Sequence, residues 1–311
     1  MSSLSPAPVN EGPGAAGPGP ARLEVKDLVV NFGGVHAVDH VSFVAEPGSV
    51  VGLIGPNGSG KTTTLDAISG NVHLRSGSVR VNGEEVTDYL PEERIAVGLV
   101  RSFQDCRLFP ELTVEDILLV CEDARHPVGV VSSTLQAPWA RRSERRKRQE
   151  VARVIEAFGL GRFRHHRAAE LSTGTRRVVD LASIVLASPR LLLLDEPTAG
   201  IAQREAEAFV PLLRRLREVA DCTIVLVEHD VPLVFSLCSH VVVLEVGKVV
   251  STGTPDEVSR DPRALAAYLG ASEEALAVSG PTRPDGVNDE RENDGVQDDG
   301  GKRGTVGDGG N

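Results

Sequence analysis

Ten consecutive residues, Gly55 to Thr64 (GPNGSGKTTT), combine three glycines, one lysine and a run of hydroxyl side chains. An apolar run, residues 50–54, precedes them, and apolar residues at helical spacing follow until Gly70. The stretch is therefore predicted to be a loop between a buried strand and a helix. Glycines let such a loop curl with its N–H groups turned inward, and the start of the helix adds partial positive charge. An anion site is predicted here, with a polyphosphate as the favoured ligand.

The same residues match the pattern G-x-x-x-x-G-K-[ST], a phosphate-binding loop of the Walker A type. In that mechanism Lys61 reaches the β- and γ-phosphates, and the Thr62 hydroxyl is a ligand of Mg²⁺. The predicted nucleotide-binding residues of the loop are Gly55, Asn57, Gly58, Ser59, Gly60, Lys61, Thr62 and Thr63. A glycine-rich turn with a solvated lysine is the alternative, and the flanking strand and helix weigh against it.

A second apolar run, Leu191–Leu194, ends in two carboxylates, Asp195 and Glu196. They would emerge at the C-terminal tip of a buried strand, where open α/β sheets bind their ligands. This is a Walker B arrangement, in which Asp195 would hold the Mg²⁺ that Thr62 also touches. Glu196 would polarise the water that attacks the γ-phosphate, a contribution usually of about 10²–10⁴-fold in rate. A turn or capping role for both carboxylates is the alternative.

The order of elements predicts an α/β fold. Residues 22–45 and 79–86 alternate apolar and polar side chains around glycine-containing turns, which indicates an antiparallel sheet beside the phosphate loop. From 112 to 158 the pattern is mostly helical. The short apolar runs 191–194 and 224–227 are typical of parallel strands buried on both faces.

Composition defines one folded region between two polar tails. The chain has 311 residues, 41% of them hydrophobic, and no run approaches the roughly 18 apolar residues of a membrane span. Residues 1–20 are rich in Pro, Gly, Ala and Ser, and 271–311 carry ten acidic and four basic side chains, a net charge of −6. Both tails are predicted to be disordered. We expect one domain over 21–270, with a helical subdomain at about 105–188.

Cysteine usage and charge narrow the function classes. The net charge of −11 argues against a general nucleic-acid binder. The cysteines show no metal-ligand spacing, and without a secretory signal they are predicted to be reduced thiols in a cytosolic protein. They are Cys106, Cys121, Cys222 and Cys238.

Residues 171–198 (LSTGTRRVVDLASIVLASPRLLLLDEPT) resemble the block between the signature and the Walker B motif of ATP-binding-cassette (ABC) ATPases. The resemblance implies an α/β, P-loop NTPase fold of the ABC ATPase type, with ATP and Mg²⁺ as cofactors and hydrolysis coupled to transmembrane transport. It also implies that Phe32 stacks on adenine and that Gln104 is the Q-loop glutamine, acting in catalysis and at the Mg²⁺. His229 would be the switch histidine, contacting the γ-phosphate beside the catalytic Glu196.

Taken singly, three of these landmarks have structural alternatives: Phe32 as a core side chain, Gln104 as a surface residue and His229 as a structural histidine. Together with the two Walker motifs and the signature, they follow the family order over about 230 residues. The order favours the functional interpretation.

The signature departs from the usual Leu-Ser-Gly-Gly-Gln, because Thr173 and Thr175 stand at its third and fifth positions. Ser172 and Gly174 remain, and Ser172 is predicted to cap a helix. In the family's head-to-tail dimer, that helix terminus would meet the γ-phosphate bound by the other subunit, so Ser172 and Gly174 are predicted nucleotide contacts. Ala202 replaces an expected aspartate, which predicts altered coupling between the two sites.

Residues 100–109, 111–115 and 253–270 further resemble the ATPases of branched-chain amino-acid uptake systems. Lipopolysaccharide-export ATPases share the Tyr-Leu-Gly ending, and relatives that move urea or amides share most of the rest. An importer of branched-chain amino acids or related small solutes is therefore predicted, with a lipopolysaccharide-type exporter as one alternative. A soluble ABC ATPase acting on ribosomes or DNA is the other, and one phosphate loop without sustained heptads argues against it.

The implied partners are a second ATPase subunit, identical or paralogous, membrane permease subunits and an extracytoplasmic solute-binding protein, with no nucleic acid. The implied location is cytoplasmic, peripheral on the inner face of the plasma membrane. The basic run 141–148 lacks an aromatic residue for base stacking and precedes an apolar helical face that begins at Val151. A solvated helix face is favoured, with a place near lipid headgroups as the alternative.

Overall fold

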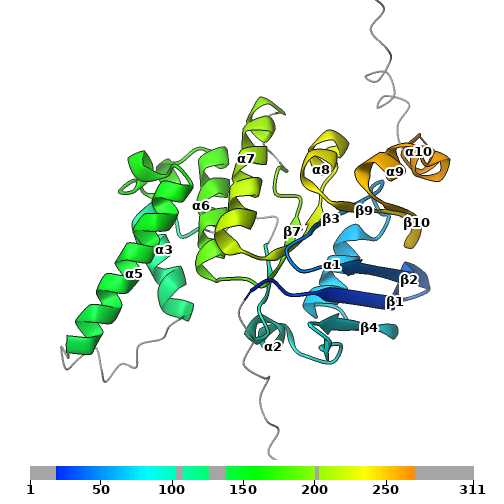
Figure 1. Ribbon diagram of the computed structural model, residues 1–311, viewed down its shortest axis with the longest axis horizontal. Helices are drawn as coiled ribbons and strands as arrows, with labels where there is room; N and C mark the ends of the chain where they lie inside the picture. Colours follow the sequence, from blue (N-terminus) through cyan, green and yellow to red (C-terminus); the bar gives the residue numbers. More distant parts are fainter. Residues whose placement is uncertain (1–18, 103–107, 126–137, 200–202, 270–311) are drawn as a thin grey trace, which may run out of the picture. The chain divides into compact units, whose positions relative to one another are not determined.

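The computed structural model describes part of the chain, drawn as solid ribbon in Figure 1. The described residues are 19–102, 108–125, 138–199 and 203–269. All of them fall in one compact unit, Met1–Glu273. The predictions for Gln104 and Ala202 lie outside the described residues, as do those for the terminal segments 1–18 and 270–311.

The described elements alternate between strands and helices along much of the chain. The strands are β1 (Leu23–Phe32), β2 (Val35–Ala45), β3 (Val50–Ile54), β4 (Ser76–Val81), β5 (Glu84–Glu85), β6 (Leu99–Arg101), β7 (Leu191–Asp195), β8 (Thr223–Val227), β9 (His240–Glu245) and β10 (Lys248–Gly253). The helices are α1 (Lys61–Ser69), α2 (Pro91–Ala96), α3 (Val114–Arg125), α5 (Pro138–Ala157), α6 (Thr173–Leu186), α7 (Gln203–Ala220), α8 (Val231–Leu237), α9 (Pro255–Ser259) and α10 (Pro262–Leu269). Two short 3-10 turns are η1 (Gly161–Phe163) and η2 (Ala168–Glu170).

Two sheets carry the fold (Figure 1). The larger has the strand order β10-β9-β3-β8-β7-β6, in which β9, β3, β8, β7 and β6 are parallel. Every residue of β3, β7 and β8 is buried, as expected for strands covered on both faces. The smaller sheet, β2-β1-β4-β5, is antiparallel. The predicted α/β fold with a flanking antiparallel sheet is confirmed.

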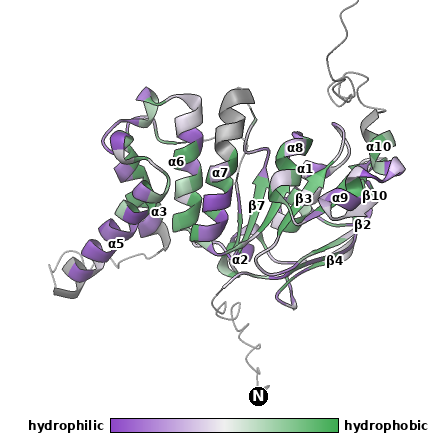
Figure 2. Cartoon of the chain, turned by 45° about the horizontal axis from the view of Figure 1, so that its top comes forward, coloured by the Kyte–Doolittle hydropathy of each residue, from purple (hydrophilic) through white to green (hydrophobic). Residues whose placement is uncertain are grey.

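Alternate residues of the central strands enter two hydrophobic cores, because successive side chains of a strand point to opposite faces. Figure 2 shows the hydrophobic colour along β3 and β7. One core joins the sheet to α3, α5, α6 and α7, and its strand residues include Leu192, Leu194, Ile224 and Leu226. The other joins the sheet to α1 and the antiparallel sheet, and its strand residues include Leu191, Leu193, Val225 and Val227.

Helices α3, α5 and α6 pack on one another, and the apolar face of α5 is buried from Val151 onward. Gly159 adopts a φ of 66°, two residues after α5 ends at Ala157, which stops the helix from continuing. The basic run lies in the first half of α5, which is mostly hydrophilic (Figure 2). From 142 to 148 its charged side chains are exposed, except that of Lys147, which is buried and paired with Asp123. The predicted solvated face therefore holds for most of the run.

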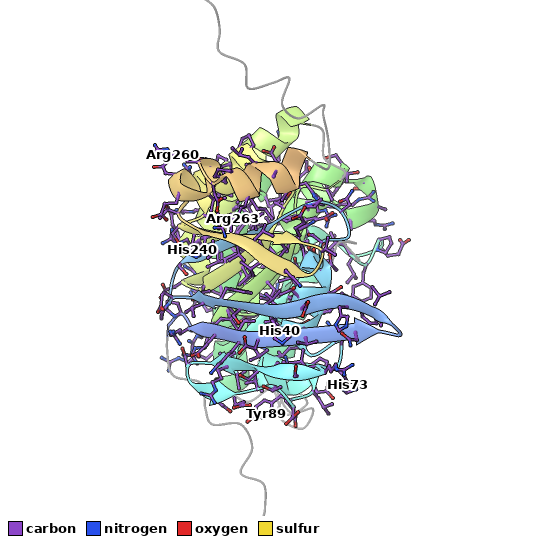
Figure 3. All side chains as sticks on the ribbon, turned by 90° about the vertical axis from the view of Figure 1, so that its right-hand side faces the viewer. His40, His73, Tyr89, His240, Arg260 and Arg263 are labelled. Carbon is purple, nitrogen blue, oxygen red and sulfur yellow. The ribbon has the colours of Figure 1, made fainter. Side chains whose placement is uncertain are left out.

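The turn between β9 and β10 joins the two sheets. Asp39 N–H donates to the Gly247 carbonyl (2.8 Å), and Lys248 Nζ lies 3.2 Å from Asp39 Oδ2. Figure 3 shows the sheets from this edge, with His40 on β2 and His240 on β9. The same turn contacts the loop that follows β3, because the Gly247 N–H donates to the Ser59 carbonyl oxygen (3.0 Å).

Candidate functional site

The loop between β3 and α1 is shaped by glycines that cannot be replaced. Gly55 has a φ of 151°, and a Cβ there would lie 2.1 Å from the Leu244 carbonyl oxygen. Gly60, which precedes the first residue of α1, has a φ of 99°, and its Cβ would lie 2.4 Å from the Ala37 carbonyl oxygen. The loop is therefore pressed against β9 and β2, and only glycine fits at these two positions.

The ammonium of Lys61 lies inside this loop. Its Nζ donates to the carbonyl oxygens of Gly55 (2.9 Å) and Pro56 (3.0 Å), and the residue is only 5% exposed. Burial lowers the pKa of Lys61, and the nearby charges of Glu196 and Asp195 oppose that shift. A lysine ammonium can form charge-assisted hydrogen bonds to phosphate oxygens, and carboxylates are ligands that Mg²⁺ accepts.

The three threonines that follow Lys61 differ in how exposed they are to solvent. Thr62 is exposed at the first turn of α1 and Thr63 is half-buried. Thr64 is buried, and its hydroxyl already donates to the Gly60 carbonyl oxygen (2.8 Å) at the start of the helix. Thr62 is accordingly the hydroxyl best placed to face a metal beside the loop.

Of the four buried side-chain polar atoms that have no hydrogen-bond partner in the described part of the chain, two belong to predicted site residues. They are Ser59 Oγ and Asp195 Oδ1, on residues that are each 2% exposed. Leaving such groups unpaired costs about 1–3 kcal/mol each, so they mark the places that a ligand would satisfy. A hydroxyl suits a phosphate oxygen, and a carboxylate oxygen suits Mg²⁺. The residues present therefore fit a Mg²⁺-nucleotide.

Glu196 and His229 meet at the ends of neighbouring strands β7 and β8. His229 Nε2 lies 2.5 Å from Glu196 Oε1, although 33 residues separate them in sequence. Glu196 adopts a φ of 47°, a region that few residues other than glycine enter, and its N–H donates to the Val227 carbonyl oxygen (2.9 Å). Two of the three predicted catalytic side chains are thus brought together beside the phosphate loop.

Asp195 is held by a residue to which the sequence pattern assigned no role. Arg101 Nη2 donates to Asp195 Oδ2 (2.9 Å), and Nη1 donates to Asp66 in α1 and to Ser69 Oγ (3.1 Å). Burial raises the pKa of Asp195, and the hydrogen bond from Arg101 opposes that rise. An arginine at the end of a short strand was the only sequence signal.

Glu228 is a second residue that the sequence pattern left without a role. It is 3% exposed, and its Oε1 accepts from the Thr198 N–H (2.9 Å) and hydroxyl (2.6 Å). Its Oε2 accepts from the His229 N–H (3.1 Å). Glu228 therefore joins the segment after Glu196 to the histidine that contacts Glu196.

The signature residues lie at the start of α6. Ser172 caps this helix, as predicted, because its Oγ accepts from the Thr175 N–H (3.2 Å), and the two hydroxyls lie 3.0 Å apart. Ser172 and Thr173 are exposed and Gly174 is half-buried. The hydrogen bonds of the Ser172 hydroxyl in the described part of the chain stay within this helix terminus.

Phe32 ends β1 and is 54% exposed, so its ring is accessible for stacking. Of the predicted site residues, Gln104 alone lies outside the described part of the chain. The structure thus places the phosphate-loop residues, Asp195, Glu196 and His229 together at the ends of the parallel strands. It places Phe32 on the antiparallel sheet.

Comparison with known proteins agrees with this geometry. The family model of the ABC transporter matches residues 38–199, and that of the branched-chain amino acid ATP-binding cassette transporter matches 248–274. The chain is 37% identical over 249 residues to the high-affinity branched-chain amino acid transport ATP-binding protein BraF of Pseudomonas aeruginosa, a match covering 80% of this chain and 97% of the relative. It is 34% identical, with the same coverage, to LivG of Escherichia coli, which carries the same description.

Solved structures lead to the same family. An ATP-binding cassette of an ABC transporter in its ADP conformation superposes with a TM-score of 0.67 at 26% identity, covering 80% of this chain and 99% of that one. In this chain, a buried lysine in a glycine loop, two carboxylates at the end of β7 and a histidine after β8 follow one another in the order that the resemblance implied. The chain belongs to the ABC transporter family and is an ATPase of that family.

Proposed function

We propose that this chain is the ATP-binding and ATP-hydrolysing subunit of an importer for branched-chain amino acids or related small solutes. The observation that carries the ATPase part is the group around Lys61: a buried ammonium in a glycine loop, facing Asp195 and Glu196. The substrate class is supported by the descriptions of the two relatives and by the family match at 248–274. That match favours the importer over a lipopolysaccharide exporter or a soluble ABC ATPase.

In the proposed reaction, Lys61 and the N–H groups of its loop bind the β- and γ-phosphates, and Ser59 donates its unpaired hydroxyl to a phosphate oxygen. Asp195 and Thr62 would hold Mg²⁺, with Gln104 as a further candidate. When bound, Mg²⁺ neutralises charge that develops on the phosphates. Glu196 polarises the attacking water, because its carboxylate is held by His229 at 2.5 Å and can accept a proton.

The second half of each site would come from another ATPase subunit, identical or paralogous. The N-terminus of α6 supports this, because Ser172 caps it, the terminus is exposed, and its N–H groups attract an anion. In a head-to-tail pair, Ser172 and Gly174 of one subunit would contact the γ-phosphate held by the loop of the other. Thr173 and Thr175 would flank that contact.

Transport would require permease subunits and an extracytoplasmic solute-binding protein, with this chain on the cytoplasmic face of the membrane. Within the described ranges, none of the helices has the length and apolar composition to cross a membrane. Selectivity for the solute would therefore reside in the partners, and this chain would contribute the free energy of its own closing and opening.

The test is ATP-driven uptake in vesicles reconstituted with the chain and its co-purified permease subunits, across leucine, isoleucine, valine, urea and short amides. We expect uptake of at least one of these solutes with wild-type protein and none with Glu196→Gln. Transport of none of them, or outward movement of lipid, would contradict the import proposal and leave the ATPase assignment standing. If the wild-type protein did not hydrolyse ATP, both the import proposal and the ATPase assignment would be contradicted.

A further inference from the structure

A single guanidinium links the Walker A helix to the Walker B strand. Arg101, the last residue of β6, donates through Nη2 to Asp195 Oδ2 (2.9 Å) and through Nη1 to Asp66 and Ser69 Oγ of α1. Helix α1 begins at Lys61 of the phosphate loop, and β7 ends at Asp195. The guanidinium therefore bridges the two elements that supply Thr62 and Asp195, two of the predicted metal ligands.

The bridge is formed away from water. The side chain of Arg101 is 10% exposed and that of Asp195 is 2% exposed, whereas Asp66 is 29% exposed. A planar guanidinium can bind two carboxylates at once through separate N–H groups. Arg101 thus holds the buried Asp195 carboxylate in place and is itself anchored by the more exposed Asp66.

The two oxygens of Asp195 are used differently. Oδ2 accepts the hydrogen bond from Arg101, whereas Oδ1 is buried and has no hydrogen-bond partner among the described residues. Because one oxygen is held, the carboxylate cannot rotate freely about its Cβ–Cγ bond. The oxygen that remains available is Oδ1.

We propose that Arg101 is a positioning residue for the metal site: it holds Asp195 by Oδ2 so that Oδ1 is presented to Mg²⁺, and it ties that carboxylate to α1 through Asp66. The inference rests on the proposed nucleotide and metal site. It assigns Arg101 no contact with the nucleotide. Removing Arg101 should therefore weaken metal binding far more than metal-free nucleotide binding.

The experiment uses Mn²⁺ as the probe, because carboxylate and hydroxyl ligands accept it in place of Mg²⁺ and its electron paramagnetic resonance signal reports binding. Affinity for Mn²⁺ is measured in the full-length chain with a saturating non-hydrolysable ATP analogue. Affinity for the analogue is measured separately in EDTA. We expect Arg101→Met to weaken Mn²⁺ binding at least tenfold and to change analogue binding in EDTA by less than about twofold.

Two further variants separate charge from geometry. Arg101→Lys keeps the positive charge but replaces the planar guanidinium, which can bind two carboxylates at once, with a single ammonium group. On a logarithmic scale of Mn²⁺ affinity, it should therefore recover less than half of the loss seen in Arg101→Met. Asp66→Asn removes the anchor and should weaken Mn²⁺ binding about threefold, with no additional effect when combined with Arg101→Met. These two variants also test the proposal if Arg101→Met does not fold.

Arg94→Met is the matched control. Arg94 is also a buried arginine against α1, where it donates to the carbonyl oxygens of Ala67 (2.9 Å) and Ile68 (2.7 Å). Its hydrogen bonds in the described structure do not include Asp195. The Arg94→Met substitution should lower the melting temperature and leave Mn²⁺ affinity unchanged.

Several outcomes would overturn the proposal. Equal Mn²⁺ affinity in wild type and Arg101→Met, or tighter binding in the variant, would show that Arg101 does not present the carboxylate. If Arg101→Lys bound Mn²⁺ as tightly as wild type, the charge of Arg101 alone would matter. If Arg94→Met lost as much Mn²⁺ affinity as Arg101→Met, the loss would come from a general disturbance of α1. Wild-type protein that binds neither the analogue nor Mn²⁺ would instead refute the proposed function.

Discussion

Replacing Glu228 with alanine should destabilise the chain and slow ATP hydrolysis together. The carboxylate accepts three hydrogen bonds, from the Thr198 N–H and hydroxyl and from the His229 N–H, at 2.9, 2.6 and 3.1 Å. Alanine leaves all three donors without their acceptor. The segment after Glu196 and the backbone of His229 then lose the carboxylate that accepts hydrogen bonds from both of them.

The size of the effect follows from burial. Hydrogen bonds to a charged group contribute about 1.5–3 kcal/mol each, but the desolvation of the Glu228 carboxylate offsets much of their sum. Thr198 is half-buried and His229 is exposed, so water can reach part of the freed donors. We therefore expect a loss of about 2–4 kcal/mol in the free energy of unfolding. For a domain of this size that is a fall of about 5–15 °C in melting temperature.

The chain contains a close match for this pair on its surface. Glu257 Oε2 accepts from the Thr254 N–H (2.8 Å) and hydroxyl (3.0 Å), but Glu257 is exposed and caps α9. Glu257→Ala should cost only about 1 kcal/mol and leave ATPase activity unchanged.

The assay is thermal and urea unfolding of both variants, with steady-state ATPase rates at a temperature where both are folded. Glu228→Ala should lower the rate at least tenfold, because His229 no longer holds Glu196 in one geometry. Equal losses of stability in the two variants, or a normal rate in folded Glu228→Ala, would refute the reasoning.

The remaining predictions concern the phosphate loop, the base and the helix cap. Lys61→Ala should weaken ATP binding greatly in calorimetry, because it removes the cation inside the loop; unchanged affinity would contradict the loop assignment. Glu196→Gln should bind ATP but hydrolyse it about 10²–10⁴-fold more slowly, and a normal hydrolysis rate would exclude Glu196 as the base. Ser172→Ala should lower the free energy of unfolding by about 0.5–2 kcal/mol, because the Thr175 N–H loses its acceptor, and an unchanged urea midpoint would argue against the cap.

Local spacing determined the phosphate loop, the buried strands and the cap of α6. Each depends on residues close together in the chain: the loop from Gly55 to Thr64, the apolar run before Asp195, and the cap of Ser172 on Thr175. A short-range pattern suffices because backbone conformation, helix capping and strand burial are set within one or two turns or a single strand. The ABC family order of these motifs could likewise be read along the sequence.

Only the tertiary structure decided how the charged residues of the site are paired. Arg101 meets Asp195 across 94 residues of sequence, and Glu228 meets Thr198 across 30. The strand order β10-β9-β3-β8-β7-β6 does not follow the chain, so the neighbours of a strand end cannot be read from spacing. Long-range pairing of strands brings these side chains together, and their burial makes each pair specific, because a desolvated carboxylate is stable only where a donor is already in place.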